Sequence, residues 1–294
     1  GLMDLDRLPR RLVILGGGYI GLEFASLFAA FGSAVTVLQD SGVFLPREDE
    51  DVAAGIKNLL EAQGVEFRLN VNTTRVEPGP AGPVLTVEEE GAARKLEADA
   101  LLAATGRTPN TAGLNCEAAG VTLTPRGAVQ VDDLLRTTAP GVWAMGDVTG
   151  GAQHTYVSLD DSRIVWTQLS GGKPRTASGR KHVPYSVFLA TPYARVGLNE
   201  REARAAGYAV KVAKLPTAAV PKAQVLRAPQ GFLKAVVDGD SGRILGAMLL
   251  CPESYETINL VALAMDLGAD YAVLRDGIYT HPTMTEALND LFSL

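Results

Sequence analysis

Residues 11–21 read Arg-Leu-Val-Ile-Leu-Gly-Gly-Gly-Tyr-Ile-Gly, a short aliphatic run that leads into a glycine-rich loop. The glycines Gly16, Gly18 and Gly21 follow a G-x-G-x-x-G spacing, with an apolar, helix-forming stretch behind them. In such a loop the first glycine permits a tight turn, the second lets backbone amides approach a pyrophosphate, and the third lets the helix pack closely on the strand. A second aliphatic run at residues 34–38 completes a strand-helix-strand unit, so the sequence predicts dinucleotide binding.

Composition and charge indicate a globular protein that binds a small molecule. The 294 residues are enough for about two domains, and an apolar content of 47% is enough to form their cores. The net charge of −6 offers no basic surface to nucleic acid or to an anionic membrane. Residues 12–38 hold one charged residue and are long enough to span a membrane, but three consecutive glycines favour a buried strand-helix-strand unit. No signal-peptide pattern is present, so we expect a cytoplasmic protein.

The cysteines and histidines do not form a metal motif. Cys116 and Cys251 are far apart in the sequence, and His154, His182 and His281 lack the spacing of metal ligands. We therefore expect no metal site.

The first part of the chain continues the predicted unit into a doubly wound, Rossmann-type α/β domain. An amphipathic helix is predicted at residues 50–63 and a strand at residues 65–69. Strands predicted at residues 84–90 and 95–104 form an antiparallel addition. We expect this domain to end near residue 107.

Two further regions follow. Residues 108–178 are expected to hold strands at 128–131 and 142–144 and a helix at 156–169. Residues 179–294 are expected to form an α+β domain. Its predicted elements are strands at 185–189, 208–214, 232–238 and 244–250, a hairpin turn at 238–242, and helices at 199–206, 254–267 and 283–292.

The residues after the second strand bear on the choice of nicotinamide cofactor. An acidic residue there accepts hydrogen bonds from a ribose 2′-hydroxyl, whereas arginines bind a 2′-phosphate. Here the chain has Gln39 and Asp40, with no basic residue until Arg47. This favours NADH, and the neutral Gln39 leaves NADPH open. Both residues are also common in turns.

Four separated segments carry a family resemblance. They occur in order: Gly-Gly-Gly-Tyr-Ile-Gly-Leu-Glu (16–23), Ala-Thr-Gly-Arg-Thr-Pro-Asn (104–110), Val-Trp-Ala-Met-Gly-Asp-Val (142–148) and His-Pro-Thr-Met-Thr-Glu (281–286). The chain resembles the pyridine nucleotide-disulfide oxidoreductases, flavoproteins that use both FAD and NAD(P)H. Within that family, residues 44–49, 183–188 and 288–294 are most similar to the reactive-chlorine-resistance and mercuric-reductase-like subgroup.

The resemblance implies that a segment is missing. Family members begin with an FAD-binding half that holds a second glycine fingerprint and a Cys-x4-Cys redox pair, and these 294 residues contain neither. The chain therefore corresponds to the C-terminal two-thirds of such an enzyme: an NAD(P)-binding domain (1–107), a remnant of the FAD-binding domain (108–178) and an α+β dimerisation domain (179–294). We expect it to be inactive as a reductase by itself.

The resemblance also assigns cofactor-binding roles. Tyr19 would cover the nicotinamide pocket and move aside for NAD(P)H, although an aromatic residue there could simply pack on the first helix. Ile20 belongs to the same glycine motif. Glu23 would pair with a lysine of the missing half and so would be left without a partner. An unpaired carboxylate on an apolar helix is costly.

Gly106 is also expected to bind a cofactor, and three more residues are assigned to FAD by the same resemblance. Gly106 belongs to the Ala-Thr-Gly-Arg motif, and Asp147 would accept hydrogen bonds from flavin hydroxyls, although Asp at a strand end is often a turn former. His154 and Thr155 lie where family members bring backbone amides to the flavin ring. For the His154 side chain we expect a capping or surface role.

His281 and Glu286 are the expected catalytic pair. Histidine exchanges protons near neutral pH, and a carboxylate bonded to its other ring nitrogen fixes the tautomer and stabilises the imidazolium. Thr283 and Glu286 also fit a capping box for the last helix, and both roles can hold together.

The implied reaction passes a hydride from NAD(P)H to FAD, then electrons to a cysteine pair and an acceptor. The His281–Glu286 pair would act as acid and base across a homodimer built on residues from about 182 onward. The alternative is a non-catalytic subunit that binds NAD(H) or serves in assembly.

Overall fold

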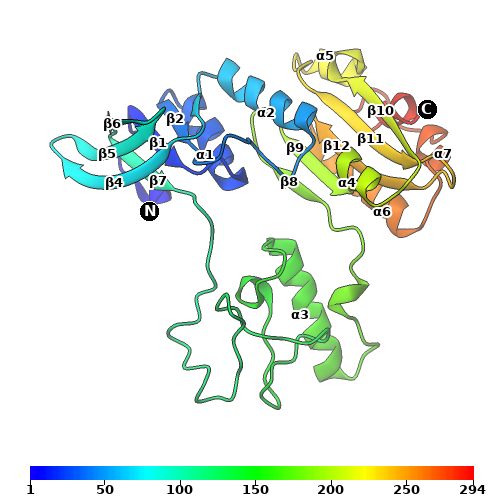
Figure 1. Cartoon of the computed structure of the whole chain (residues 1–294). Helices are drawn as coiled ribbons and strands as arrows, with labels where there is room; N and C mark the ends of the chain where they lie inside the picture. Colours follow the sequence, from blue (N-terminus) through cyan, green and yellow to red (C-terminus); the bar gives the residue numbers. More distant parts are fainter. The chain divides into compact units, whose positions relative to one another are not determined.

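The computed structural model describes residues 1–294. The chain divides into two compact units, shown in Figure 1. One consists of Gly1–Thr105 together with His182–Leu294, and the other is Gly106–Lys181.

A parallel four-stranded sheet forms the first part of the larger unit (Figure 1). Its strands are β1 (Arg11–Leu15), β2 (Ala34–Leu38), β3 (Glu66–Arg68) and β7 (Ala100–Ala103), in the order β3-β2-β1-β7. Helix α1 (Tyr19–Ala30) connects β1 to β2, and α2 (Glu50–Ala62) connects β2 to β3. The predicted α/β class and the strand-helix-strand unit are confirmed.

The two faces of this sheet are covered differently. Ile14 of β1 packs in one core with Leu22 of α1 and Ile56 of α2. Its neighbour Val13 points to the opposite face, where it packs with Leu85. That face is covered by an antiparallel sheet of β4 (Asn72–Gly79), β5 (Gly82–Glu89) and β6 (Ala92–Glu97). The alternation along β1 thus buries both sides of the strand.

The single strand predicted at residues 95–104 is wrong, because two strands of different sheets occupy this stretch. β6 ends at Glu97 and pairs antiparallel with β5, whereas β7 begins at Ala100 and pairs parallel with β1. Asp99 lies at the break. Its N–H donates to the Arg11 carbonyl (2.9 Å) and its Oδ2 accepts from the Arg11 N–H (3.0 Å), which turns the chain from one sheet into the other.

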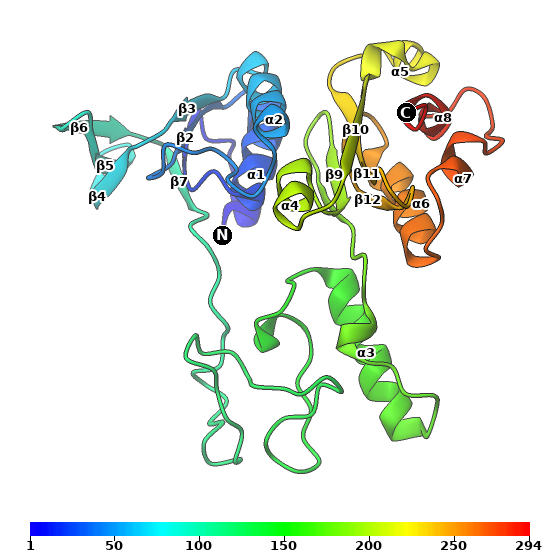
Figure 2. The same ribbon diagram turned by 45° about the vertical axis from the view of Figure 1, so that its right-hand side comes forward.

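A five-stranded antiparallel sheet forms the C-terminal part of the larger unit (Figure 2). Its strands, in the order β10-β11-β12-β9-β8, are β8 (Tyr185–Val187), β9 (Tyr193–Gly197), β10 (Val210–Pro216), β11 (Phe232–Asp238) and β12 (Ile244–Leu250). The helices are α4 (Glu200–Ala205), α5 (Pro221–Val225), α6 (Ser254–Asp266), α7 (Ala272–Arg275) and α8 (Ala287–Leu291). β11, β12 and the turn that joins them agree with the prediction, since the Gly242 N–H donates to the Asp238 carbonyl at 2.9 Å.

The structure differs from the prediction in one strand and in the last helix. Strand β9 was not predicted, because its residues are buried on both faces and show no polar-apolar alternation. It also contains Arg195. The last helix begins at Ala287 rather than at residue 283. The preceding residues form a turn that includes the cis peptide bond between His281 and Pro282.

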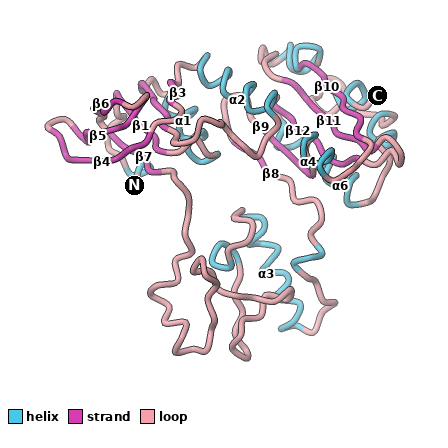
Figure 3. The backbone as a smooth tube through the Cα atoms, viewed as in Figure 1, coloured by secondary structure: helices cyan, strands magenta, loops and turns pink.

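The smaller unit is mostly loop around one helix, α3 (Thr155–Ser170), as Figure 3 shows. The strands predicted at 128–131 and 142–144 are wrong. Only isolated bridges form there, Leu123 with Val129 and Arg136 with Trp143. Short 3-10 helices occur in both units, at Leu2–Asp4, Gly146–Thr149, Ala177–Gly179 and Thr217–Ala219.

The apolar stretch at residues 12–38 is β1, α1 and β2. No helix in the chain combines the length and the apolar character that crossing a membrane requires.

Candidate cofactor-binding and acid-base sites

The glycine loop joins β1 to α1, and its first and third glycines are required by close backbone contacts. Gly16 has a φ of 100°, and a Cβ there would lie 2.6 Å from the carbonyl oxygen of Ala104 on the neighbouring chain segment. A Cβ on Gly21 would overlap the carbonyl oxygen of Gly16. A side chain at Gly21 would force the helix away from the strand, and one at Gly16 would push the loop away from the segment after β7.

Gly18 differs from both, because a Cβ there would meet no atom within 4 Å. It is the N-cap residue of α1, with φ −77° and ψ 171°, and it is exposed. The backbone around Gly18 is thus open to a ligand at the N-terminus of a 12-residue helix. Unpaired amides and the helix dipole favour an anion at such a position.

Gln39 contacts this loop. Its Oε1 accepts a hydrogen bond of 2.9 Å from the N–H of Gly17. The side chain therefore occupies one loop amide and keeps its own Nε2 as a donor. Asp40, the next residue, is exposed.

The other predicted residues of this part lie on α1. Tyr19 is its first residue, and the Tyr19 hydroxyl donates to Glu48 Oε1 and lies 3.2 Å from the Tyr185 hydroxyl. Ile20 is exposed. The expectation that Glu23 lacks a partner is wrong: its Oε1 accepts the Phe188 N–H at 2.9 Å.

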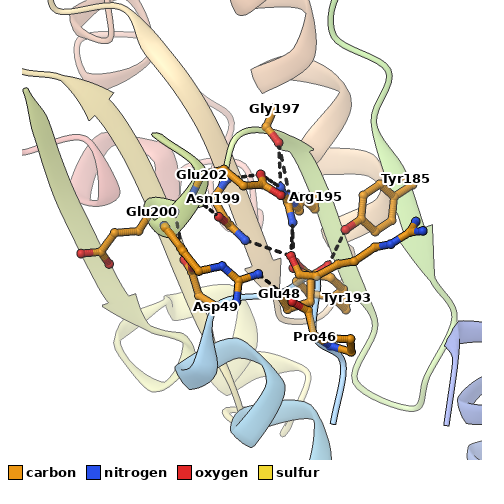
Figure 4. A network of polar contacts seen from close by, with 12 residues as sticks. Pro46, Glu48, Asp49, Tyr185, Tyr193, Arg195, Gly197, Asn199, Glu200 and Glu202 are labelled. Atoms are coloured by element: carbon orange, nitrogen blue, oxygen red, sulfur yellow. Dashed lines mark hydrogen bonds and ion pairs between the residues drawn. The ribbon is translucent and has the colours of Figure 1, made fainter. Parts of the chain in front are cut away.

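Glu48 is the centre of a buried polar cluster that the sequence analysis did not find (Figure 4). The Glu48 cluster comprises Tyr19, Glu48, Tyr185, Tyr193 and Arg195. The Glu48 side chain is fully buried. Its Oε1 accepts from the hydroxyls of Tyr19 and Tyr185, the latter at 2.5 Å, and its Oε2 accepts from the Tyr193 hydroxyl and from Arg195 Nη1 at 3.3 Å.

Burial raises the pKa of all three tyrosine hydroxyls in the Glu48 cluster, and the nearby Glu48 charge raises it further for each. The hydroxyls therefore remain protonated and act as donors. A buried carboxylate needs such donors, because an ionised group removed from water is otherwise very costly. Residues 48–51, Glu-Asp-Glu-Asp, hold more acidic residues than helix capping requires, and this excess was the available sequence signal.

A second buried charge lies beside the cluster. Lys234 of β11 has a side chain only 4% exposed, and its Nζ lies 2.9 Å from Asp49, 3.1 Å from Asp51 and 3.0 Å from Glu200. Burial opposes the charge on Lys234, but hydrogen bonds to these carboxylates outweigh it and raise the lysine pKa. Asp49 also accepts the Glu200 N–H at 3.1 Å. Segment 48–51 thus ties the first sheet to the C-terminal sheet.

Gly106 and the predicted flavin-binding residues lie in the smaller unit. Gly106 has a φ of 129° and open space around it. Asp147 is exposed and lies 3.4 Å from Arg107, which the sequence analysis did not single out. Thr155 is the exposed first residue of α3.

His154 is the N-cap residue of α3, and its imidazole makes no capping hydrogen bond. The ring stacks on Tyr156 with centroids 5.1 Å apart. Burial, and then the charge of Arg107, lower the pKa of His154.

The structure brings His281 and Glu286 together. His281 Nδ1 lies 2.7 Å from Glu286 Oε2, and the His281 side chain is 68% exposed whereas that of Glu286 is 18% exposed. Glu286 Oε1 accepts from the Thr283 N–H, and the Glu286 N–H donates to Thr283 Oγ1, both at 3.3 Å. The capping-box bonds and the histidine contact therefore coexist, although the box lies in the turn before α8.

Comparison with known protein families identifies the family of this chain. Residues 2–162 match the pyridine nucleotide-disulphide oxidoreductases, and residues 183–292 match the dimerisation domain of the same family. The chain belongs to the pyridine nucleotide-disulphide oxidoreductase family, as its motifs predicted.

Three individual relatives show which members of the family this chain is similar to. The chain is 52% identical over 294 residues to the probable pyridine nucleotide-disulfide oxidoreductase RclA of Escherichia coli, covering 100% of this chain and 66% of the relative. It is 36% identical to mercuric reductase of Bacillus cereus (98% and 45% covered) and 34% identical to dihydrolipoyl dehydrogenase of Thermus scotoductus (96% and 61% covered). The predicted similarity to the reactive-chlorine-resistance and mercuric-reductase-like subgroup is confirmed.

Solved structures show the same relationship. The Cu(II) complex of the HOCl-induced flavoprotein disulfide reductase RclA from Escherichia coli matches with a TM-score of 0.95 at 52% identity, over 99% of this chain and 65% of that one. LpdA from Mycobacterium tuberculosis matches with a TM-score of 0.90 at 27% identity, over 99% of this chain and 62% of that one. The chain thus spans about two thirds or less of the length of the relatives it matches.

Proposed function

We propose that this chain is the NAD(P)H-binding and dimer-forming part of an FAD-dependent disulfide oxidoreductase. The observation that carries the proposal is the glycine loop: Gly16 and Gly21 are held by close backbone contacts, while Gly18 is open at the N-terminus of α1. This combination fits a pyrophosphate better than a plain turn, which does not need an open second glycine. The family match supports the same function.

The proposed domain division is 1–107 for NAD(P)H, 108–178 for part of the FAD site and 179–294 for dimerisation. Gly16, Gly18 and Gly21 would hold the pyrophosphate of the nicotinamide cofactor, and Ile20 would line the same motif. Nicotinamide and flavin together supply the hydride chemistry, and the protein supplies position and electrostatics.

The residues proposed for FAD, Asp147, His154 and Thr155, all lie in residues 108–178. Asp147 carries a carboxylate that can accept hydrogen bonds from flavin hydroxyls. Gly106, at the end of the 1–107 domain, is proposed as a cofactor-binding residue with open space around it. His154 and Thr155 begin α3, whose N-terminal amides suit a polar edge of the ligand.

His281 and Glu286 would serve the thiol chemistry of the partner subunit. Glu286 holds Nδ1, so the other ring nitrogen of the exposed His281 is available to a substrate or thiol. Large apolar side chains are exposed on α6 and beyond it, which suits a dimer interface: Leu263, Leu267, Val273 and Ile278. We propose a disulfide or a related sulfur group as the acceptor, in keeping with the names of the relatives.

Calorimetric titration of the chain with NADH and NADPH tests the proposal. Gly18→Ala should fold normally, because its Cβ meets no atom, but should weaken binding about tenfold by blocking the backbone. Gly113→Ala is the matched control, since Gly113 is equally open, has no positive φ and lies outside the loop. Failure of the unmodified chain to bind either cofactor would overturn the proposal.

A further inference from the structure

Tyr19 links two parts of the larger unit. It is the first residue of α1, directly after the open Gly18, and its hydroxyl donates to Glu48 Oε1. The Tyr19 ring is tilted against Tyr185 of β8, with centroids 5.5 Å apart. The ring beside the glycine loop is therefore held by residues that are distant in sequence.

Glu48 itself is fixed from the C-terminal sheet. Tyr193 is fully buried in β9 and donates to Oε2. Arg195 also contacts Oε2, and it is anchored by Glu202 and by the Gly197 and Arg47 carbonyls. Figure 4 shows Glu48 facing both Tyr193 and Arg195. The carboxylate consequently keeps its position whether or not the Tyr19 hydroxyl is present.

The side chains that donate to Glu48 differ in how deeply they are buried. Tyr19 is only partly buried and lies at the loop, whereas Tyr193 is enclosed in the sheet. If Tyr19 turned away, Tyr185, Tyr193 and Arg195 would still donate to the carboxylate. Release of Tyr19 thus breaks its hydrogen bonds to Glu48 and Tyr185 but leaves three donors on the buried carboxylate.

We propose that Glu48 is a positioning residue that holds Tyr19 closed beside the glycine loop, and that NAD(P)H binding releases this hydroxyl. The inference rests on the proposed function and on the role that the family resemblance gives Tyr19, which is to cover the nicotinamide pocket. A cofactor that must displace a bonded tyrosine binds more weakly, in proportion to the fraction of molecules already open. Glu48 would therefore set cofactor affinity without touching the cofactor.

The test compares two variants that each remove a tyrosine hydroxyl. One hydroxyl donates to Glu48 Oε1 and the other to Glu48 Oε2. Tyr19→Phe keeps the ring and removes the bond to Oε1, so the full chain should bind NADH about tenfold more tightly. Tyr193→Phe removes an equivalent bond to Oε2 and should change NADH affinity less than about twofold while lowering stability. In the Glu48→Gln background, Tyr19→Phe should have a smaller effect, because the bond it removes is no longer charge-assisted.

The outcomes separate this inference from the proposed function. Binding of NADH by the unmodified chain, with equal affinities for Tyr19→Phe and the unmodified chain, overturns the role of Glu48 but leaves the proposed function intact. Weaker binding by Tyr19→Phe also overturns it, since the hydroxyl would then contact the cofactor. Absence of NADH binding overturns the proposed function, and the release on cofactor binding with it.

A measurement without cofactor tests whether Glu48 holds the Tyr19 side chain in place. Fluorine NMR of the 3-fluorotyrosine-labelled chain identifies the Tyr19 signal by its loss in Tyr19→Phe. Glu48→Gln should move that signal toward the position of an exposed tyrosine, and an unchanged signal would show that Glu48 does not hold the ring.

Discussion

Gln39 Oε1 accepts a hydrogen bond of 2.9 Å from the N–H of Gly17, so the residue after β2 is bound to the glycine loop itself. The bond orients the amide, and the Nε2 group is the donor that remains for a ligand. A neutral donor accommodates a ribose 2′-hydroxyl as well as a 2′-phosphate.

Gln39→Glu should therefore make the chain discriminate against NADPH. The glutamate can still accept from Gly17, but its charge repels a 2′-phosphate, so NADPH affinity should fall by about tenfold or more while NADH affinity changes little. Calorimetric titration of both cofactors measures the ratio. Gln130→Glu adds the same charge at an exposed position of the smaller unit, and an equal loss of NADPH affinity there would refute a local effect.

Gly21→Ala should destabilise the chain by about 2 kcal/mol, a typical cost of forcing an atom into a packed site. Its Cβ would overlap the Gly16 carbonyl oxygen, whereas Gly18→Ala in the same loop meets no atom and should leave stability within about 0.5 kcal/mol. Urea denaturation of both variants gives the comparison. Equal stabilities would mean that the helix does not pack on the loop as described.

Lys234→Met should lower the free energy of unfolding by about 3 kcal/mol, because it leaves the buried Asp49 carboxylate without its cation. Lys214 also contacts Asp51 but is 43% exposed, so Lys214→Met should cost less than about 1 kcal/mol. Chemical denaturation at neutral pH measures both changes. Similar losses for the two lysines would contradict the importance of burial.

The same charges predict a loss of stability in acid. Burial opposes the charge on Asp51, but hydrogen bonds from Lys214 and Lys234 outweigh it and lower the pKa of Asp51; Arg204 and Lys234 lower that of Glu200. A lowered pKa in the folded state adds stability that is present above the unfolded-state pKa of about 4 and is lost as pH falls through the folded-state value. Unfolding measured from pH 7 to pH 3 should show this decline, and a shallower decline in Lys234→Met.

In an enzyme completed by the FAD-binding half and its cysteine pair, His281→Ala should slow the thiol-dependent half-reaction by about a hundredfold, the lower range for an acid-base group, and leave the half-reaction with NADH within about twofold. Thr283→Val removes the Oγ1 contact to the Glu286 N–H but keeps Glu286 on His281, so it should retain most of the thiol-dependent rate. Stopped-flow measurement separates the two half-reactions. Equal loss of both in His281→Ala would argue against the assigned role.

Local patterns in the sequence were enough to predict most elements of the sheets. β2, β11 and β12 agree residue for residue, because aliphatic runs bounded by turn residues are short-range signals. β9 escaped notice because it is buried on both faces and contains Arg195, whose charge is meaningful only beside Glu48. The break at Asp99 was missed for the same reason, since its partner Arg11 is 88 residues away.

The chain's spacing of Gly16, Gly18 and Gly21, and the proximity of His281 to Glu286, could be read from the sequence because each involves residues a few positions apart. The Glu48 cluster could not, because Tyr193 lies 145 residues from Glu48. Whether a carboxylate is solvated or buried, and which hydroxyls reach it, depends on how two distant sheets pack against each other. The sequence alone therefore determined most strands of the sheets and the spacing of the glycine loop, and tertiary packing decided how the strands divide between the sheets and which charged groups join them.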